Sequence, residues 1–268
     1  MSVQLQRAID ILELIEQTDG PVSLGDIALR LDLPKSAAHR LLQVWLERGY
    51  IEQDATSQRY SATLKLAVLG FAHLNATGIR DVCYPDMRLL ARETGELARL
   101  AVIDGDTLTW AAEAQGARDG LRYDGNIGRQ ALLYTTAAGK AWLAALDNEE
   151  AMRLVLAQGF PDGKRSGPRA LHSMRELLDD LERTRARGYA TAIEEAAVGV
   201  NAVAAAVYES AGSRTCVGAL IIVGPSARLT PARIDEVAPL LSAASARISS
   251  LWPIRRHMAN DLGPQGVA

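Results

Sequence analysis

The chain has 268 residues, of which 48% are hydrophobic and 5% aromatic, and its formal net charge is −3. This length suits two domains with sizeable cores, and the composition is that of an ordinary soluble protein. The sequence has no apolar run of about eighteen residues, which argues against a membrane span. Acids interrupt the opening segment MSVQLQRAIDILELIEQ, which argues against a signal peptide. We therefore predict a cytoplasmic protein.

The two cysteines give no sign of a metal site or a disulfide framework. Cys83 and Cys216 lie far apart in the sequence, without a Cys-X-X-Cys spacing or a neighbouring histidine pair. We interpret both as packed thiols, and we expect neither a metal nor another cofactor.

Three helices and a hairpin are predicted within residues 1–62. Apolar residues recur every three to four positions over 5–17, and this helix should end at the Asp-Gly-Pro of 19–21. A second helix opens at Ser23, three residues before Asp26, in a capping-box arrangement. Pro34 suits the start of a third helix, which Gly49 ends, and 50–62 reads as two short strands around a turn. This order of elements is the winged helix-turn-helix plan.

The third predicted helix has one polar and one apolar face. Its polar residues cluster near its N-terminus, at Lys35, Ser36, His39 and Arg40. We predict that this face enters a major groove, with Arg59 of the hairpin near a phosphate. Binding must then depend on the placement of charge, because residues 1–62 contain six Lys or Arg against nine Asp or Glu. The alternative is the solvated face of a small helical bundle.

Residues 63–78, TLKLAVLGFAHLNATG, are apolar nearly all round a predicted helix. Such a helix needs a partner on several sides, so we interpret it as a connecting helix at a dimer interface. A symmetric pair would present two third helices to one duplex.

Beyond residue 79 the pattern predicts a mixed α+β module. We expect a helix ending at Gly95, a hairpin turning at residues 104–106, and a helix from about Thr136. Helices follow at 149–157 and 173–187, then strands at 201–209 and 215–224, and a last helix from Thr230-Pro231 to about residue 251. The expected organisation is a DNA-binding domain at 1–62, a linker at 63–79, an effector domain at 80–252 and a flexible tail at 253–268.

These blocks together resemble the IclR family of bacterial transcriptional regulators. The resemblance runs from LQRAIDILELI through LPKSAAHRLLQVWLERGYIEQD, RLAVIDGDTL and ALLYTTAAGKAWLA to VGPSARLTPARI, and covers nearly all of 3–251. It implies a winged helix-turn-helix, a linker helix and a GAF-like α/β effector-binding domain, working as a homodimer or a dimer of dimers on double-stranded operator DNA.

The resemblance also implies roles for particular residues. The DNA-reading helix would contain the four polar residues named above, and the DNA backbone would be approached by Arg7, Ser23 and Arg59. The effector cavity would be lined by Leu121, Tyr123, Ala131, Thr136, Ala137, Ala138, Ala192, Val200, Ala202 and Ile221. Independently of the family, the free N–H groups at a helix start near Thr136 suit a carboxylate.

The chain departs from the family pattern where polar effectors would need partners. Ala192 stands where an acidic residue is common, Ala202 where a cysteine is common, and Ala206 where a proline is frequent, while Ile221 replaces a serine of some relatives. Together they predict an apolar cavity with one anion-binding end, suited to an aromatic or branched aliphatic acid. The alternative is that these alanines only repack the core.

Catalysis is not expected. The segment AAGKA lacks the first glycine of a phosphate loop, since Tyr134 is there, and Ala141 replaces the metal-binding hydroxyl. Adjacent Glu194 and Glu195 would point to opposite faces of a strand, and the four histidines are scattered. We therefore predict a DNA-binding regulator controlled by a small organic acid; the alternative is a ligand-binding scaffold whose N-terminal domain pairs with protein.

Overall fold

The computed structural model describes residues 3–125, 130–160 and 166–261. The chain separates into two compact units, Met1–His73 and Leu74–Ala268, each with its own core. Within the described ranges no helix is long and apolar enough to cross a membrane.

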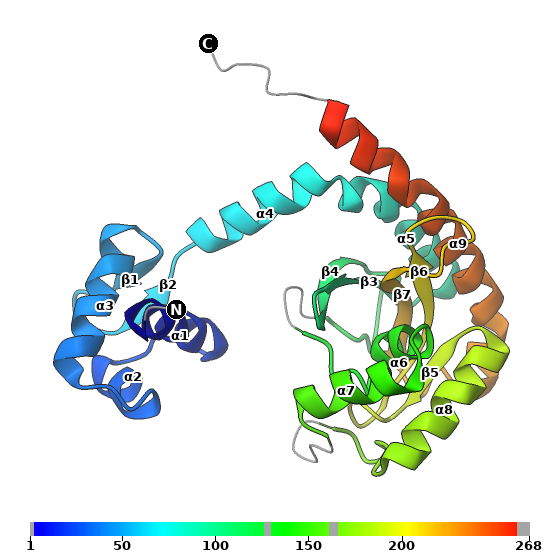
Figure 1. The fold of residues 1–268 in the computed structure, drawn as a ribbon, viewed down its shortest axis with the longest axis horizontal. Coiled ribbons are helices and arrows are strands. Elements are labelled where there is room, and N and C mark those ends of the chain that lie inside the picture. Colours follow the sequence, from blue (N-terminus) through cyan, green and yellow to red (C-terminus); the bar gives the residue numbers. More distant parts are fainter. Residues whose placement is uncertain (1–2, 126–129, 161–165, 262–268) are drawn as a thin grey trace. The chain divides into compact units, whose positions relative to one another are not determined.

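The first unit contains the predicted three helices and hairpin (Figure 1). Its elements are α1 (Val3–Gln17), α2 (Leu24–Arg30), α3 (Lys35–Glu47), β1 (Ile51–Gln53) and β2 (Tyr60–Ala62), and α4 (Lys65–Thr77) begins in this unit and ends in the second. The strands pair antiparallel, and the core joins all three helices to the hairpin through Ile11, Ile27, Leu42, Ile51 and Tyr60. This is the winged helix-turn-helix expected from the sequence.

One hydrogen bond ties α3 to α1, and a backbone bridge ties the segment before α2 to the hairpin. The Trp45 indole Nε1 donates to the Ala8 carbonyl of α1 at 2.8 Å, and Val22 and Tyr60 exchange backbone hydrogen bonds of 2.8 Å. Between α2 and α3 the chain turns through Asp32, whose φ of 48° is one that Asp tolerates better than most residues. The packing therefore leaves the opposite face of α3 at the surface.

The second unit is a five-stranded antiparallel sheet with helices on both faces. Its elements are α5 (Ile79–Thr94), β3 (Leu97–Asp104), β4 (Thr107–Ala114), α6 (Ala137–Ala144), α7 (Asn148–Gln158), α8 (Met174–Arg187), β5 (Ala190–Ile193), β6 (Val200–Tyr208), β7 (Cys216–Pro225) and α9 (Pro231–Asp261). The strand order is β4-β3-β7-β6-β5. The sequence analysis did not predict β5 as a strand, because four residues at a sheet edge give too short an alternation to recognise.

Alternation along the strands divides the second unit into two cores. Leu97 and Ala101 of β3 face α6, α7 and α8, whereas Ala98 and Leu100 face α5 and α9. The helices therefore form separate layers on the two faces of the sheet (Figure 1).

Two parts of the second unit differ from the sequence-based expectation. The last helix continues past Pro253 to Asp261, where we expected a flexible tail from 253; residues 262–268 lie outside the described ranges. Glu194 and Glu195 follow the end of β5 in a bend, with a φ of 52° at Glu194, so they do not occupy a strand. Their carboxylates still do not converge, since Glu195 accepts from Lys140 and Glu194 from the Gly199 N–H.

Both cysteines are free thiols, as expected for packed side chains. Burial raises the pKa of Cys83 to about 12 and that of Cys216 to about 11. Both thiols therefore stay protonated and weakly nucleophilic at neutral pH.

Candidate functional site

The polar face of α3 is at the surface, as a DNA-reading face requires. Lys35, Ser36, His39 and Arg40 are all exposed, while Ala38 and Leu42 on the other side are buried. The His39 ring lies 3.4 Å from the Gln43 amide nitrogen on the same face. These side chains begin in the first turn of α3, where the helix dipole also favours a phosphate.

The three residues expected near the DNA backbone have different surroundings. Arg7 is exposed on α1, and Arg59 is exposed on the hairpin, donating from Nη1 to the Pro21 carbonyl at 3.1 Å. Ser23 caps α2: its hydroxyl accepts from the Asp26 N–H at 3.1 Å and donates to the Asp26 carboxylate at 2.7 Å. Ser23 therefore supports the start of α2 directly.

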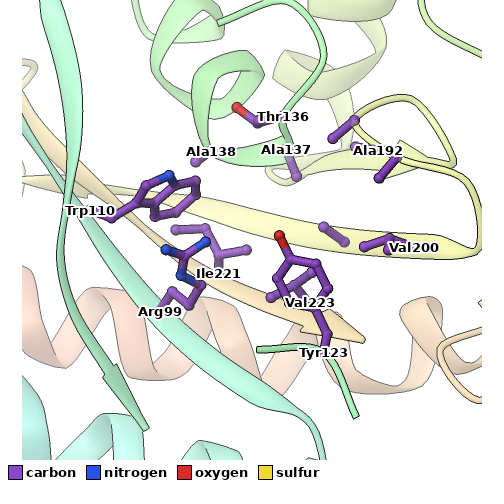
Figure 2. A pocket seen from close by; sticks show the side chains of 13 residues that line it. Arg99, Trp110, Tyr123, Thr136, Ala137, Ala138, Ala192, Val200, Ile221 and Val223 are labelled. Carbon is purple, nitrogen blue, oxygen red and sulfur yellow. The ribbon is translucent and has the colours of Figure 1, made fainter. Parts of the chain in front are cut away.

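A cavity of about 90 Å³ lies in the second unit, between the N-terminus of α6 and the sheet (Figure 2). Its walls come from the start of α6, all five strands of the sheet, the segment before residue 125 and the bend after β5. It is lined by Arg99, Trp110, Tyr123, Thr136, Ala137, Ala138, Ala192, Ala196, Ala197, Val200, Ala202, Ile221 and Val223.

Most of the residues predicted for the effector cavity line this space. Tyr123, Thr136, Ala137, Ala138, Ala192, Val200, Ala202 and Ile221 are brought together there. Leu121 and Ala131 are not among the lining residues. The Leu121 side chain is 68% exposed, and Ala131 is buried in the core beside β4, where its N–H donates to the Leu108 carbonyl.

The sequence analysis missed Arg99, Trp110, Ala196, Ala197 and Val223. A signal for Arg99 was present in LARLAVID: alternation places position 99 on the same inward face as Leu97 and Ala101. A charged residue at an inward strand position is uncommon and often marks a site. Trp110 gives no comparable signal, because its proximity to Arg99 depends on the β3–β4 pairing, which shifts register between Leu100 and Ala101.

The N-terminus of α6 contributes backbone to the cavity wall. Thr136 is its N-cap, with a hydroxyl that accepts from the Gly139 N–H at 3.1 Å and donates to the Leu132 carbonyl at 2.7 Å. Gly139 is required here, since a Cβ would come within 2.3 Å of the Leu133 carbonyl oxygen. The Thr136 hydroxyl is thus used for capping, and Figure 2 shows its oxygen directed away from Ile221.

Arg99 supplies the charge of the cavity. Its side chain is 4% exposed, its guanidinium carbon lies 3.8 Å from the centre of the Trp110 ring, and Nε is 3.7 Å from Glu113 Oε2. Burial lowers the pKa of Arg99, while Tyr123 and Glu113 act in the opposite direction. An arginine remains protonated at neutral pH despite such a shift, so the cavity has a cationic end.

An ion cluster anchors the wall opposite the sheet. Lys140 of α6 is 1% exposed and donates to both Glu195 oxygens at 2.7 and 2.8 Å, while Asp180 of α8 lies 2.9 Å away. Burial raises the pKa of Glu195. Ala196 and Ala197 follow Glu195 directly in the sequence. The ion cluster therefore determines where the bend after β5 meets the cavity.

The segment that contains Tyr123 is attached at two points. Gln115 Nε2 donates to the Tyr123 carbonyl at 3.0 Å, and the Arg228 guanidinium donates to the Leu121 carbonyl. Arg228 is itself held by Glu96 through two hydrogen bonds of 2.7 and 2.8 Å. Tyr123 thus closes one side of the cavity from a segment without regular secondary structure.

Two family models match the chain, one in each part. Residues 4–55 match the IclR helix-turn-helix domain, and residues 71–250 match the bacterial transcriptional regulator IclR C-terminal domain. The HTH-type transcriptional repressor AllR of Escherichia coli is 33% identical over 253 residues, covering 94% of this chain and 91% of AllR. AllR of Salmonella typhi is 32% identical over 255 residues, covering 95% and 92% of the two chains.

Solved structures share the same fold. An IclR-type transcriptional regulator from Alicyclobacillus acidocaldarius superposes with a TM-score of 0.79 at 24% identity, covering 93% of this chain and 98% of that one. An IclR homologue from Microbacterium hydrocarbonoxydans, described as complexed with 4-hydroxybenzoate, gives a TM-score of 0.76 at 20% identity, covering 94% and 99%.

Proposed function

Because this chain belongs to the IclR family and is a DNA-binding transcriptional regulator, not an enzyme, we propose that a small organic acid in the cavity sets its affinity for operator DNA. The observation that carries the proposal is a mainly apolar cavity with one buried cation, on the α6 face of the second unit. A site of this kind favours a ligand with an anionic group and an apolar body.

The proposed DNA contacts are the exposed residues of α3, which would read base edges, and Arg7, Ser23 and Arg59, which would approach the phosphates. The first unit has more acids than bases, so a single copy offers few phosphate contacts. Pairing of two copies through α4 would double those contacts, and this supports a homodimer, or a dimer of dimers, as the DNA-bound form.

We propose an aromatic acid as the first candidate effector. Trp110, Tyr123 and Ile221 offer apolar surface to a ring, and Ala192 and Ala202, which pair across β5 and β6, offer no hydroxyl or carboxylate to a polar effector. A structural relative is described as complexed with 4-hydroxybenzoate, an aromatic acid, and this supports the candidate.

A short aliphatic acid is a second candidate, favoured by the volume of the cavity. The space of about 90 Å³ is smaller than the cavity of about 150 Å³ that accepts benzene in another protein. An aromatic acid would therefore need the cavity to widen, and the segment of Tyr123 is a suitable wall for this because it has no regular secondary structure.

Binding of the purified protein to the DNA fragment beside its own gene tests the proposal. Affinity should fall steeply between about 50 and 200 mM salt, as expected for phosphate contacts. Benzoate-like acids or short aliphatic acids should then change that affinity, whereas neutral aromatics should not. Salt-independent association would favour the protein-pairing scaffold, and an operator affinity that no acid alters would contradict the proposed effector class.

A further inference from the structure

The segment that follows β4 reaches the cavity without regular secondary structure. We call residues 115–125 the strap; all of them are described, and none is fully buried. Tyr123 is the strap residue that lines the cavity, and Figure 2 shows its side chain extending from the strap toward Ala137. Because no strap side chain is fully buried, the position of the strap depends mainly on backbone contacts and hydrogen bonds.

The start of the strap is fixed by Gly116. Its N–H donates to the Glu96 carbonyl at 3.1 Å, and a Cβ at this position would come within 2.0 Å of the Ala91 carbonyl oxygen. Gln115 joins the two arms of the strap, because its Nε2 donates to the Tyr123 carbonyl at 3.0 Å. The start cannot move without repacking, so any movement of the strap takes place beyond Gly116.

One arginine ties the rest of the strap to the sheet. The Arg228 guanidinium donates to the Leu121 carbonyl and, through Nε and Nη2, to the two Glu96 carboxylate oxygens at 2.7 and 2.8 Å. The Glu96 side chain is 6% exposed, and it packs against Gly224 of β7, where a Cβ would come within 2.3 Å of Oε2. Among the described residues, the bond from Arg228 to Leu121 is the one hydrogen bond that joins residues 117–125 to a part of the unit outside the strap.

Glu96 orients the Arg228 guanidinium before that group reaches the strap. A guanidinium bound at two points by a carboxylate has a fixed plane, so its remaining N–H groups have fixed directions. Hydrogen bonds from charged groups are stronger than neutral ones, and the loss of one would shift a local opening equilibrium by about tenfold or more. Leu121 is two residues from Tyr123, so its release would free this wall of the cavity.

We infer that Arg228 and Glu96 form a latch that holds the strap over the cavity, and that release of this latch admits ligands larger than the present space of about 90 Å³. The inference rests on the proposed function and deepens it, because it names the residues that decide which size of acid enters. A short acid fits beneath the latched strap, whereas an aromatic ring requires the strap to move.

Alkylation of a thiol inside the cavity tests the latch without any ligand. Ala202→Cys places a thiol on the cavity wall, and iodoacetamide followed by mass spectrometry measures how fast that thiol reacts in the full-length protein. Adding Arg228→Met should raise this rate at least about tenfold, because a larger fraction of molecules would have an open strap. Arg233→Met, which removes the cation of an exposed ion pair of α9 with Glu236, is the control and should leave the rate unchanged.

Two comparisons separate opening of the strap from loss of structure. Cys83 is fully buried in the core on the opposite face of the sheet, so its alkylation reports general unfolding and should not change. Glu96→Gln retains Arg228 and nearly the shape of the glutamate, and it should also accelerate alkylation in the cavity; this variant decides the matter if Arg228→Met does not fold. An unchanged rate in the deciding variant, or an equal acceleration at Cys83, would overturn the latch.

Calorimetry with benzoate and isobutyrate, on chains that retain Ala202, tests the selection by size. The affinity for benzoate relative to isobutyrate should rise at least about fivefold in Arg228→Met, since the ring no longer has to displace the bond to Leu121. An unchanged ratio would overturn the selection by size. If the wild type binds neither acid, the effector class under the proposed function fails and the selection by size fails with it, while alkylation of the free protein still decides the latch.

Discussion

Lys140 shows how a single side chain joins three parts of the second unit. Its ammonium group contacts Glu195 after β5 and Asp180 of α8, while its backbone belongs to α6. Burial favours a raised pKa at both carboxylates; at Asp180 the charges of Lys140 and Arg183 outweigh burial and lower the pKa. Lys140 therefore favours the ionised form of two poorly solvated carboxylates beside the cavity.

Replacing Lys140 with Met should lower the free energy of unfolding by about 3–5 kcal/mol, because two buried carboxylates would lose their cation. Urea denaturation at neutral pH measures this change. The loss should be smaller near pH 5, because unpaired buried carboxylates have raised pKa values and the folded variant takes up protons as the pH falls. Arg233→Met, which breaks an exposed ion pair with Glu236, is the control and should cost no more than about 1 kcal/mol. A comparable loss in both variants would contradict this account.

Arg40 is the side chain for which DNA reading is easiest to test. It is exposed on α3, so its removal leaves the core of Ala38 and Leu42 intact. Arg40→Ala should weaken operator binding by about 1–3 kcal/mol if the guanidinium contacts a base edge. A gel-shift titration measures the affinity, with Arg153→Ala of α7 as the matched loss of charge. Unchanged affinity for Arg40→Ala would remove this residue from the contact set.

Among whole elements, α4 is the one that the single chain leaves unexplained. Leu64, directly before the helix, is 81% exposed, and Val68 and Leu69 within it are 62% and 50% exposed, although the helix contains hardly any charge. Apolar side chains exposed along one helix are typical of an interaction surface. This agrees with the role of a dimer helix proposed from the sequence.

Leu69→Glu, and likewise Leu66→Glu, should therefore yield monomers or aggregates, because an unpaired carboxylate would be buried in the proposed interface. Analytical ultracentrifugation measures the assembly state. Leu156→Glu changes a leucine of α7 that is 60% exposed and provides the control. If both α4 variants sediment as the wild type does, the interface lies elsewhere.

At the scale of the whole molecule, the proposed DNA-reading face and the cavity belong to different compact units. Every residue that lines the cavity lies within Leu74–Ala268, and two apolar clusters provide that unit with its own core. The exposed face of α3 belongs to Met1–His73. The regulator thus combines two separately stabilised parts.

A fragment that begins at residue 79 retains every wall of the cavity and both apolar clusters of its core. We therefore expect this fragment to fold and to bind the same acid as the full chain, with an affinity within about threefold. Calorimetry on the fragment, with circular dichroism to establish folding, tests this expectation. A folded fragment without affinity for an acid that the full chain binds would show that the first unit contributes to the site.

The sequence by itself determined the elements and their order, since these depend on neighbours along the chain. Pro34 and Gly49 bound α3, Thr136 begins α6, and the polar residues of α3 fall on one face by helical periodicity alone. The family also followed from the sequence and is confirmed by the matches to both of its domains. The short edge strand β5 was not predicted, because its local pattern is weak and pairing with β6 decides it; the length of α9 was not predicted either.

Only the tertiary structure decided which polar groups meet at the cavity. Arg99 faces Trp110 because of a register between two strands, and Lys140 meets Glu195 across 55 residues of chain. Such pairings depend on how the sheet and its covering helix pack together, which local periodicity does not encode. The sequence therefore led us to the N-terminus of α6 as the anion site, whereas the fold placed a buried cation on the sheet beneath it.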